Sequence, residues 1–246
     1  MAFVSLGMAT LATALLVAGR IDVTPTDDLW MVLENAQPGD EIVIHAGTYN
    51  MDGLRQFAFA GTETDPIVVR AEDGDEVLIE GISDQNTLNV EGTHYTIRGL
   101  KIHGGSHGIR VGTSTRALFE DLEIWGTGDV GFSCNLETNV YDTITIRRVH
   151  IHDTAGTGEC MYLGCNDDKC QMFDSLVEFN WCHDTLAGTQ GDGIELKTGS
   201  YGNVILHNVI HDVKFPVIAI YASVVPMPAI NVEGNVVWST DRKSVV

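Results

Sequence analysis

Cationic side chains are scarce in this chain. It has 14 Lys and Arg against 34 Asp and Glu, a formal charge of −20, and such an acidic chain repels nucleic-acid phosphates and anionic lipid surfaces. We therefore expect no nucleic-acid partner, and a polyanionic substrate would need a metal ion or a local cationic cluster. Proline is also rare, with 6 residues against 26 Gly, which argues against long linkers and favours short strands joined at tight corners.

No apolar run is long enough to cross a membrane. The run over residues 3–17 falls short of the roughly 20 residues that a spanning helix needs. Small residues follow it, and the first cation is Arg20. We therefore interpret residues 1–19 as a signal peptide and residues 20–246 as one domain of a secreted or cell-surface protein with no membrane span. A buried N-terminal helix is the alternative.

A seven-residue frame recurs along the chain and is the main signal for the fold. Successive frames start 22 to 31 residues apart, and a further short apolar strand precedes each of the later ones. Such short repeats leave no room for crossover helices, which need about ten residues or more. The frames are Ile97–His103, Phe119–Trp125, Ile146–His152, Val177–His183, Ile205–His211 and Val232–Trp238.

A coil of stacked repeats satisfies these constraints. Stacking joins the backbones of neighbouring turns by hydrogen bonds and buries the inward side chains as a column. Equivalent residues should then recur, and the fourth frame position is apolar in three repeats and then Asn180, Asn208 and Asn235. Stacked amides can hydrogen-bond one another. The sequence therefore predicts an all-β, single-stranded parallel β-helix, a solenoid.

These repeats resemble the right-handed parallel β-helix of the pectate-lyase-like superfamily. An amphipathic helix over residues 27–40, ended by Pro38-Gly39, and a strand and corner over residues 41–49 match its N-terminal part. The resemblance implies that this short helix caps the open end of the coil. No matching cap follows Trp238, so we expect an uncapped C-terminal end. Truncation, a missing domain and an end-to-end homodimer are the open explanations.

Aligned strands predict rows of outward side chains on one face. Glu159 and Asp192 lie at strand entrances, Glu195 lies in the next row, and carboxylates of adjacent turns could share Ca²⁺, which takes about six to eight oxygen ligands. Asp167 and Asp168, in an insertion, could overhang this group; chance juxtaposition in an acidic chain is the alternative. The rows are Arg110, Ser133, Tyr162, Glu195 and Ala219, and Gly112, Asn135, Gly164, Lys197 and Tyr221.

Residues 191–203 resemble the stretch of the alginate and chondroitin B lyase family that carries acidic calcium ligands and a lysine base. The resemblance implies Lys197 as the base and Asp192 as a ligand, with Glu195 shifted from the family's spacing. Removing the proton beside a uronic carboxylate requires a metal to neutralise that carboxylate, a base, and an acid for the leaving oxygen. An ordinary solvated lysine is the alternative for Lys197.

The family's acid is an arginine on the following turn, and residues 215–221 contain none. Tyr221, His211 or Lys214 would have to replace it. We expect a polysaccharide lyase that cleaves an acidic, uronate-containing polysaccharide by calcium-assisted β-elimination, with Arg110, Asn135, Tyr162 and Lys214 binding substrate.

Two other functions suit the same scaffold. One is a non-catalytic solenoid that binds glycan or a protein partner, and the other is a glycoside hydrolase or uronan epimerase. A hydrolase needs two facing carboxyl groups, one with a raised pKa, for which Asp167 or Asp168 with Glu195 are the candidates.

His-Asp pairs recur at residues 152–153, 183–184 and 211–212, in one row with His103, Trp125 and Trp238. A catalytic pair is needed once but a corner is needed at every turn, so we interpret them as corners whose Asp bonds backbone amides and whose rings stack. A metal ladder and acid-base dyads are the alternatives.

The five cysteines of an exported chain favour disulfides, although the odd number leaves at least one without a partner in the chain. We expect Cys165–Cys170 within the insertion and Cys134–Cys160 between neighbouring turns, with Cys182 facing the core. Zinc ligation and buried free thiols are the alternatives.

Overall fold

The computed structural model describes residues 19–185, 187–221 and 225–238. Nearly all of the predicted signal peptide and the last eight residues of the chain lie outside these ranges, so the signal peptide remains a prediction. Within the described residues no helix is long and apolar enough to cross a membrane.

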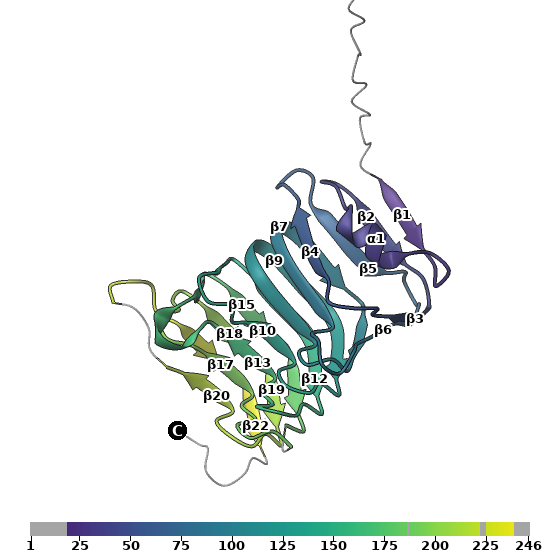
Figure 1. The fold of residues 1–246 in the computed structure, drawn as a ribbon. Coiled ribbons are helices and arrows are strands. Elements are labelled where there is room, and N and C mark those ends of the chain that lie inside the picture. Colours follow the sequence, from purple (N-terminus) through teal and green to yellow (C-terminus); the bar gives the residue numbers. More distant parts are fainter. Residues whose placement is uncertain (1–18, 186, 222–224, 239–246) are drawn as a thin grey trace, which may run out of the picture.

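The described elements are short strands and one α-helix, arranged along an elongated body from the purple N-terminal end to the yellow C-terminal end (Figure 1). They are β1 (Arg20–Val23), α1 (Leu29–Glu34), β2 (Glu41–Ile44), β3 (Gly47–Asn50), β4 (Gln56–Ala60), β5 (Ile67–Ala71), β6 (Val77–Glu80), β7 (Leu88–Arg98), β8 (Lys101–His103), β9 (Ile109–Trp125), β10 (Phe132–Cys134), β11 (Val140–Asp142), β12 (Thr145–His152), β13 (Met161–Leu163), the 3-10 helix η1 (Asn166–Asp168), β14 (Gln171–Phe173), β15 (Leu176–Glu178), β16 (Trp181–His183), β17 (Ile194–Leu196), β18 (Val204–Leu206), β19 (Val209–His211), β20 (Ile218–Ile220), β21 (Asn231–Glu233) and β22 (Val236–Trp238).

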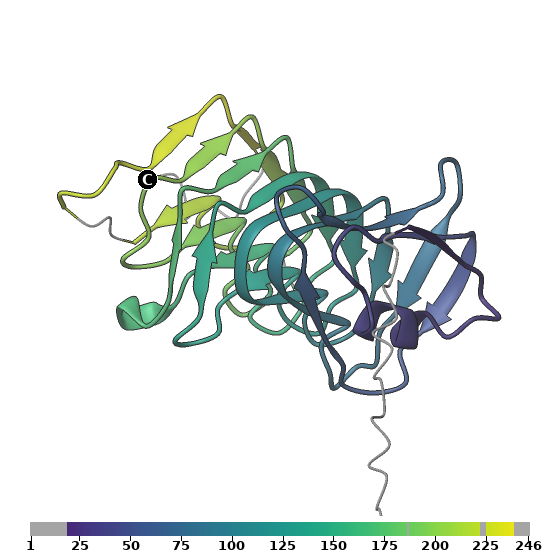
Figure 2. The same ribbon diagram turned by 90° about the horizontal axis from the view of Figure 1, so that it is seen from above.

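The strands form three main parallel columns, each built from one strand per turn. The first column runs β1, β2, β5, β7, β9, β12, β15, β18 and β21. The second runs β3, β6, β8, β9, β12, β16, β19 and β22. The third runs β4, β7, β9, β10, β13, β17 and β20. The view from above shows the turns following one another along the coil (Figure 2), and the predicted parallel β-helix is confirmed.

Alternation along each strand places the core inside the coil. In β10, β13 and β17 the first and third side chains are buried apolar residues of the core. The middle side chain, on the opposite face of the strand, is polar in β10 and β17 and a tyrosine in β13, and those of β10 and β17 are also buried. The long strands β7 and β9 each pass through a corner and contribute to more than one column. One continuous hydrophobic cluster therefore runs through the coil.

The predicted asparagine ladder is present. The Asn180 side chain donates to Oδ1 of Asn208 at 2.9 Å, and Asn208 donates to Oδ1 of Asn235 at the same distance. Their oxygens also accept backbone N–H groups; Asn208, for example, accepts from the amide of Asn180. The ladder thus satisfies polar backbone groups that the corner would otherwise bury unpaired.

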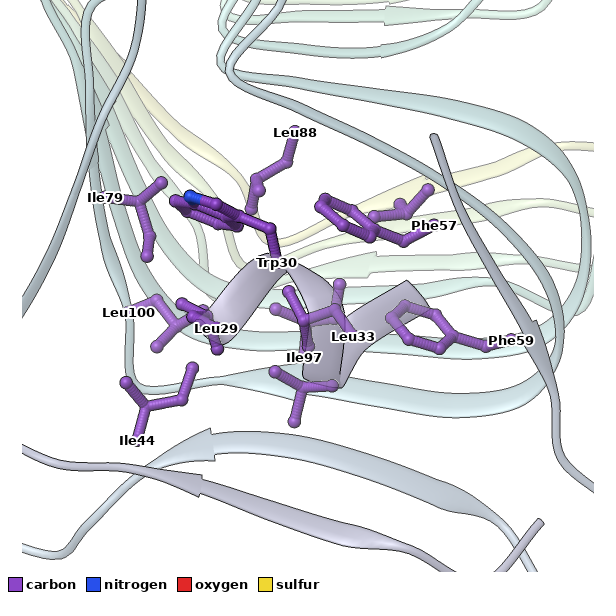
Figure 3. Close-up of a pocket in the computed structure, with 12 residues that line it drawn as sticks. Leu29, Trp30, Leu33, Ile44, Phe57, Phe59, Ile79, Leu88, Ile97 and Leu100 are labelled. Carbon is purple, nitrogen blue, oxygen red and sulfur yellow. The ribbon is translucent and has the colours of Figure 1, made fainter. Parts of the chain in front are cut away.

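Helix α1 closes the N-terminal end of the core, but it is shorter than predicted. It begins after Asp28, whose carboxylate accepts from the amide of Met31, and it ends at Glu34. The Asn35 side chain donates to the carbonyl of Met31. This bond satisfies a carbonyl at the C-terminal end of the helix, which therefore ends before Pro38. Figure 3 shows the helix lying over the first turns, with Leu29, Trp30 and Leu33 directed to the coil's apolar interior. Strand β1 precedes the helix, and the sequence did not indicate it.

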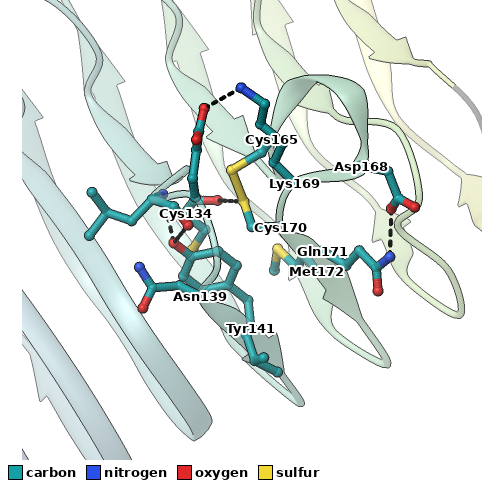
Figure 4. Close-up of a disulfide and its surroundings, with 12 residues drawn as sticks. Cys134, Asn139, Tyr141, Cys165, Asp168, Lys169, Cys170, Gln171 and Met172 are labelled. Atoms are coloured by element: carbon teal, nitrogen blue, oxygen red, sulfur yellow. Dashed lines mark hydrogen bonds and ion pairs between the residues drawn. A yellow bond between two sulfur atoms is a disulfide. The ribbon is translucent and has the colours of Figure 1, made fainter.

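Disulfides join Cys160 to Cys182 and Cys165 to Cys170. The second pairing was predicted, but the predicted Cys134–Cys160 bond is wrong: Cys134 is a buried free thiol whose pKa is raised by burial. Cys182 does face the core, as predicted, and there it takes Cys160 as its partner. Figure 4 shows Cys134 beside the Cys165–Cys170 bridge, with the ring of Tyr141 close by. Its packing makes the Cys134 thiol unreactive.

Strands β21 and β22 form the last described turn, in which Val232, Val236, Val237 and Trp238 are exposed. The residues after Trp238 lie outside the described ranges, and the uncapped C-terminal end remains a prediction.

Candidate active site

The third strand column carries the first predicted row in the predicted register, and the second from Asn135 onward. Arg110 pairs with Ser133, Ser133 with Tyr162, Tyr162 with Glu195, and Glu195 with Ala219. The backbone bonds from Gly164 to Cys134, from Lys197 to Leu163 and from Tyr221 to Leu196 extend the alignment to the second row. The rows therefore bring residues from well-separated parts of the chain onto one wall.

Three carboxylates converge at the centre of this wall. Candidate ligand oxygens of Glu159, Asp192 and Glu195 all lie within 4.8 Å of one another, and all three side chains are buried. Both carboxylate oxygens of Glu159 and one of Glu195 have no hydrogen-bond partner among the described residues. We call these residues the acidic trio.

Burial and repulsion raise the pKa of two of the three carboxyl groups. Burial, followed by the charges of Glu195 and Glu159, raises the pKa of Asp192 to about 7. Burial, followed by the charges of Glu195 and Asp129, also raises the pKa of Glu159. A site in which several buried carboxylates lack donors favours either protonation or a bound cation.

Lys197 lies against the acidic trio. Its Nζ is 2.5 Å from Oε1 of Glu195, and it lies over the rings of Tyr162 and Tyr221, 4.4 and 4.3 Å from their centroids. The side chain is only 5% exposed, so a solvated surface lysine is excluded. Cation–π contacts on both sides position the ammonium group.

The backbone opposite Lys197 has room only for glycine. Gly164 has φ +87°, and a Cβ there would lie 2.9 Å from Oγ of Ser200 and 3.1 Å from Cβ of Lys197. The close approach of this strand end helps to bury the lysine.

The two tyrosines differ in exposure. Tyr162 is half-buried, whereas Tyr221 is 56% exposed at the edge of the site. Burial and the neighbouring Glu195 carboxylate raise the pKa of each phenol to about 12. Tyr221 therefore carries its proton at neutral pH and is open to an incoming ligand.

Two further polar residues on the wall have unused hydrogen-bonding capacity. Nε of Arg110 and Oδ1 of Asn135 are buried and lack a partner among the described residues. Arg110 lies three turns before Glu195 in the same row. Nε of Arg110 can donate a hydrogen bond to a ligand, and Oδ1 of Asn135 can accept one.

Other predicted site residues do not join the acidic trio. Asp167 and Asp168 are exposed in η1, and Asp168 accepts a bond from Gln171, so neither is a member of the three-carboxylate group. His211 belongs to the second column, where its ring stacks on His183 and Trp238 and bonds Asp212. Nζ of Lys214 donates to the carbonyl of Gly188 at 2.6 Å.

The recurring His-Asp pairs are corners, as predicted, with one difference. Asp153, Asp184 and Asp212 have positive φ, and the rings of the row stack. Each Asp, however, accepts a bond from Nδ1 of its own histidine, whereas bonds to backbone amides were expected. The positive φ suits Asp because its short side chain tolerates the left-handed region.

The sequence did not single out His107. Its Nδ1 lies 2.9 Å from Oγ of Ser133 in the Arg110 row, and its Nε2 lies 3.7 Å from Asp129. Burial and the charge of Arg110 lower its pKa to about 4, so the ring is neutral at pH 7. His107 does not recur in the repeats. The only feature of the sequence that pointed to it was its position just before the strand that carries Arg110.

The chain is similar in sequence to known proteins. A family model described as "Pel9A-like, right handed beta helix region" matches residues 18–213. The pectate lyase PEL9 of Emericella nidulans is 24% identical over 138 residues, which are 50% of this chain and 33% of that protein. This chain thus matches about a third of the length of that relative.

Solved structures agree on the fold. The pectate lyase Pel9A superposes with a TM-score of 0.65 at 16% identity, covering 90% of this chain and 70% of that one. An alginate lyase from Paenibacillus sp. str. FPU-7 gives 0.54 at 17% identity, covering 94% and 100%. A mannuronic acid specific family 6 lyase from human gut microbiota gives 0.59 at 15% identity, covering 89% and 52%.

Proposed function

This chain belongs to the Pel9A-like right-handed β-helix family, and on that premise we propose that it is an exported polysaccharide lyase that cleaves a uronate-containing polymer by β-elimination. The observation that carries the proposal is the buried acidic trio in contact with Lys197. A base held beside a cation-binding group is the combination that elimination next to a carboxylate requires.

The acidic trio fits a calcium ion. Its donors are hard carboxylate oxygens from Glu159, Asp192 and Glu195, and three of those oxygens lack partners. A calcium ion bound there would neutralise the uronate carboxylate of the substrate and would compete with Lys197 for the carboxylate of Glu195.

The protein's own groups account for the proton transfers. Neutral Lys197 takes the proton from C5 of the uronate, while the C4–O bond breaks and a C4–C5 double bond forms. The phenol of Tyr221, which is protonated at neutral pH, donates its proton to the departing glycosidic oxygen. Water then restores both groups, and the product carries an unsaturated uronate.

Substrate would lie along the same wall. Arg110 offers a cationic group with an unused donor, and Asn135 offers an unused acceptor. Tyr162 supplies an apolar ring face for a sugar, as well as its contact with Lys197. These groups, with Lys214 at the edge, would hold an acidic chain on an otherwise anionic protein.

The test follows the ultraviolet absorbance of an unsaturated uronate with pectate, alginate and chondroitin-type polymers, with CaCl₂ or with EDTA. Lys197→Arg keeps the cation but cannot act as a base at neutral pH, so we expect kcat to fall by about 10²-fold or more. Lys169→Arg, at an exposed pair with Glu137, is the matched control and should leave kcat unchanged.

Tyr221→Phe separates the acid from the base. It keeps the ring over Lys197 and removes only the phenol, so kcat should fall while the fold persists. Absence of product with every polymer in CaCl₂ would overturn the lyase proposal and favour a glycan-binding solenoid. Full activity of Lys197→Arg would remove this residue as the base.

A further inference from the structure

A second group of metal-ligating side chains lies on the second strand column, outside the acidic trio. Candidate ligand atoms of Glu123, His150 and His152 lie within 4.8 Å of one another, and each side chain is partly buried. Glu123 belongs to one turn and the two histidines belong to the next, where Glu123 pairs with His150 in register.

Hydrogen bonds fix the proton on two rings of this column. Nδ1 of His152 lies 2.7 Å from Asp153, and Nδ1 of His183 lies 2.7 Å from Asp184. A carboxylate accepts but does not donate, so each Nδ1 carries a proton and Nε2 is the nitrogen left to accept a hydrogen bond or bind a metal.

The tautomer of the third ring, His150, follows from that of His183. Nε2 of His150 lies 2.7 Å from Nε2 of His183. Because the His183 nitrogen is the acceptor, His150 donates through Nε2 and keeps its lone pair on Nδ1.

Three acceptors therefore face one another. Oε1 of Glu123 is 3.5 Å from Nε2 of His152 and 3.8 Å from Nδ1 of His150. Nε2 of His152 is buried and has no hydrogen-bond partner among the residues that the structure describes. Lys101 approaches the other carboxylate oxygen, Oε2, at 3.6 Å, so Oε1 is left for this group.

The distances of 3.5 and 3.8 Å from Oε1 of Glu123 to the two nitrogens are close to the spacing of ligands around a small cation. Bond lengths of about 2.0–2.2 Å in a tetrahedral zinc site separate the ligand atoms by about 3.3–3.6 Å. Two imidazole nitrogens and one carboxylate oxygen suit zinc better than calcium, which prefers oxygen ligands alone.

We propose that Glu123, His150 and His152 form a zinc-binding site whose fourth position is left to water. Asp153 and the His183–Asp184 pair orient the two ligating rings through their remaining N–H groups, the arrangement that outer partners of metal-bound histidines commonly have. A zinc ion there would link two consecutive turns of the coil. The site is independent of the proposed lyase activity.

The test is calorimetric titration of ZnCl₂ into the tag-free chain, after dialysis against EDTA and in excess CaCl₂ to occupy the acidic trio. We expect one zinc per chain and a rise in Tm, because zinc binds the folded state. His152→Gln should weaken zinc binding about 100-fold or more. His103→Gln is the matched control, since His103 lies in the same stacked row and pairs with Glu80; its affinity should match that of the unmodified chain.

A second variant protects the test against misfolding. Asp153 has φ +54°, which asparagine tolerates, so Asp153→Asn should fold and should weaken zinc binding about 10- to 100-fold. Cobalt substitution should give the visible bands of tetrahedral nitrogen and oxygen ligation. Lack of stoichiometric zinc binding by the unmodified chain, or unchanged affinity in both His152→Gln and Asp153→Asn, would overturn the site.

Discussion

Replacing Asp192 by asparagine tests the electrostatics of the acidic trio. The pKa of Asp192 rises from 3.8 to about 7 on folding, so the folded state binds more protons than the unfolded state between these pH values. Stability contributed by this proton is therefore present at low pH and is lost as the pH rises towards 7. A shift of about three units corresponds to about 4 kcal/mol at most, at about 1.4 kcal/mol per unit.

Other titrating groups, such as His107, make stability change with pH in the opposite direction. Their effect must be removed by comparing the variant with the unmodified chain. His107 has a pKa lowered to about 4, so its contribution to stability is lost as the pH falls from about 6.5 to 4. The difference between Asp192→Asn and the unmodified chain cancels His107, because both proteins contain it. Asp73→Asn, at a side chain that is 96% exposed, serves as the control.

The assay is urea denaturation in EDTA at pH 4.5, 6 and 8. Relative to the unmodified chain, Asp192→Asn should become more stable by up to about 3 kcal/mol between pH 4.5 and pH 8, because the lowest pH already lies above 3.8. CaCl₂ at pH 8 should stabilise the unmodified chain more than the variant. Parallel pH profiles for the two proteins would refute the assignment of a buried, repelled carboxyl group to Asp192.

Three further perturbations probe the ladder, the disulfides and the strand end at Lys197. Asn208→Ala removes the bonds to Asn235 and to the carbonyl of Val177, and urea denaturation should show a loss of about 2–4 kcal/mol, against no change for the exposed Asn231→Ala. Replacing both cysteines of the 160–182 disulfide by alanine should destabilise by about 3 kcal/mol, more than the about 2 kcal/mol for the 165–170 pair, because its loop is longer; equal losses would contradict the loop argument. Gly164→Ala should lower both Tm and kcat, because its Cβ would press on Lys197; unaltered kcat would show that this contact does not position the lysine.

The periodic part of the structure could be predicted from the sequence. Each turn must satisfy the same backbone bonds and must bury a side chain at the same place, so equivalent residues recur in the chain itself. Recurrence alone predicted the parallel columns, the ladder of Asn180, Asn208 and Asn235, and the register that joins Tyr162 to Glu195.

The features that occur once could not be predicted in this way. Whether Lys197 is solvated or buried depends on Tyr162, Tyr221 and the close approach of Gly164, none of which repeats along the chain. The disulfide partner of Cys160 likewise depended on which cysteine lies next to it in the folded chain, and that cysteine is Cys182.

The sequence by itself determined that successive repeats stack, because the pattern of apolar side chains and corner residues recurs in every turn. Only the tertiary structure decided which side chains on the wall touch, how deeply the acidic trio is buried, and which ring nitrogens face Glu123. Those properties depend on the distances between side chains of different turns and on the exclusion of water between them, and no interval along the chain contains that information.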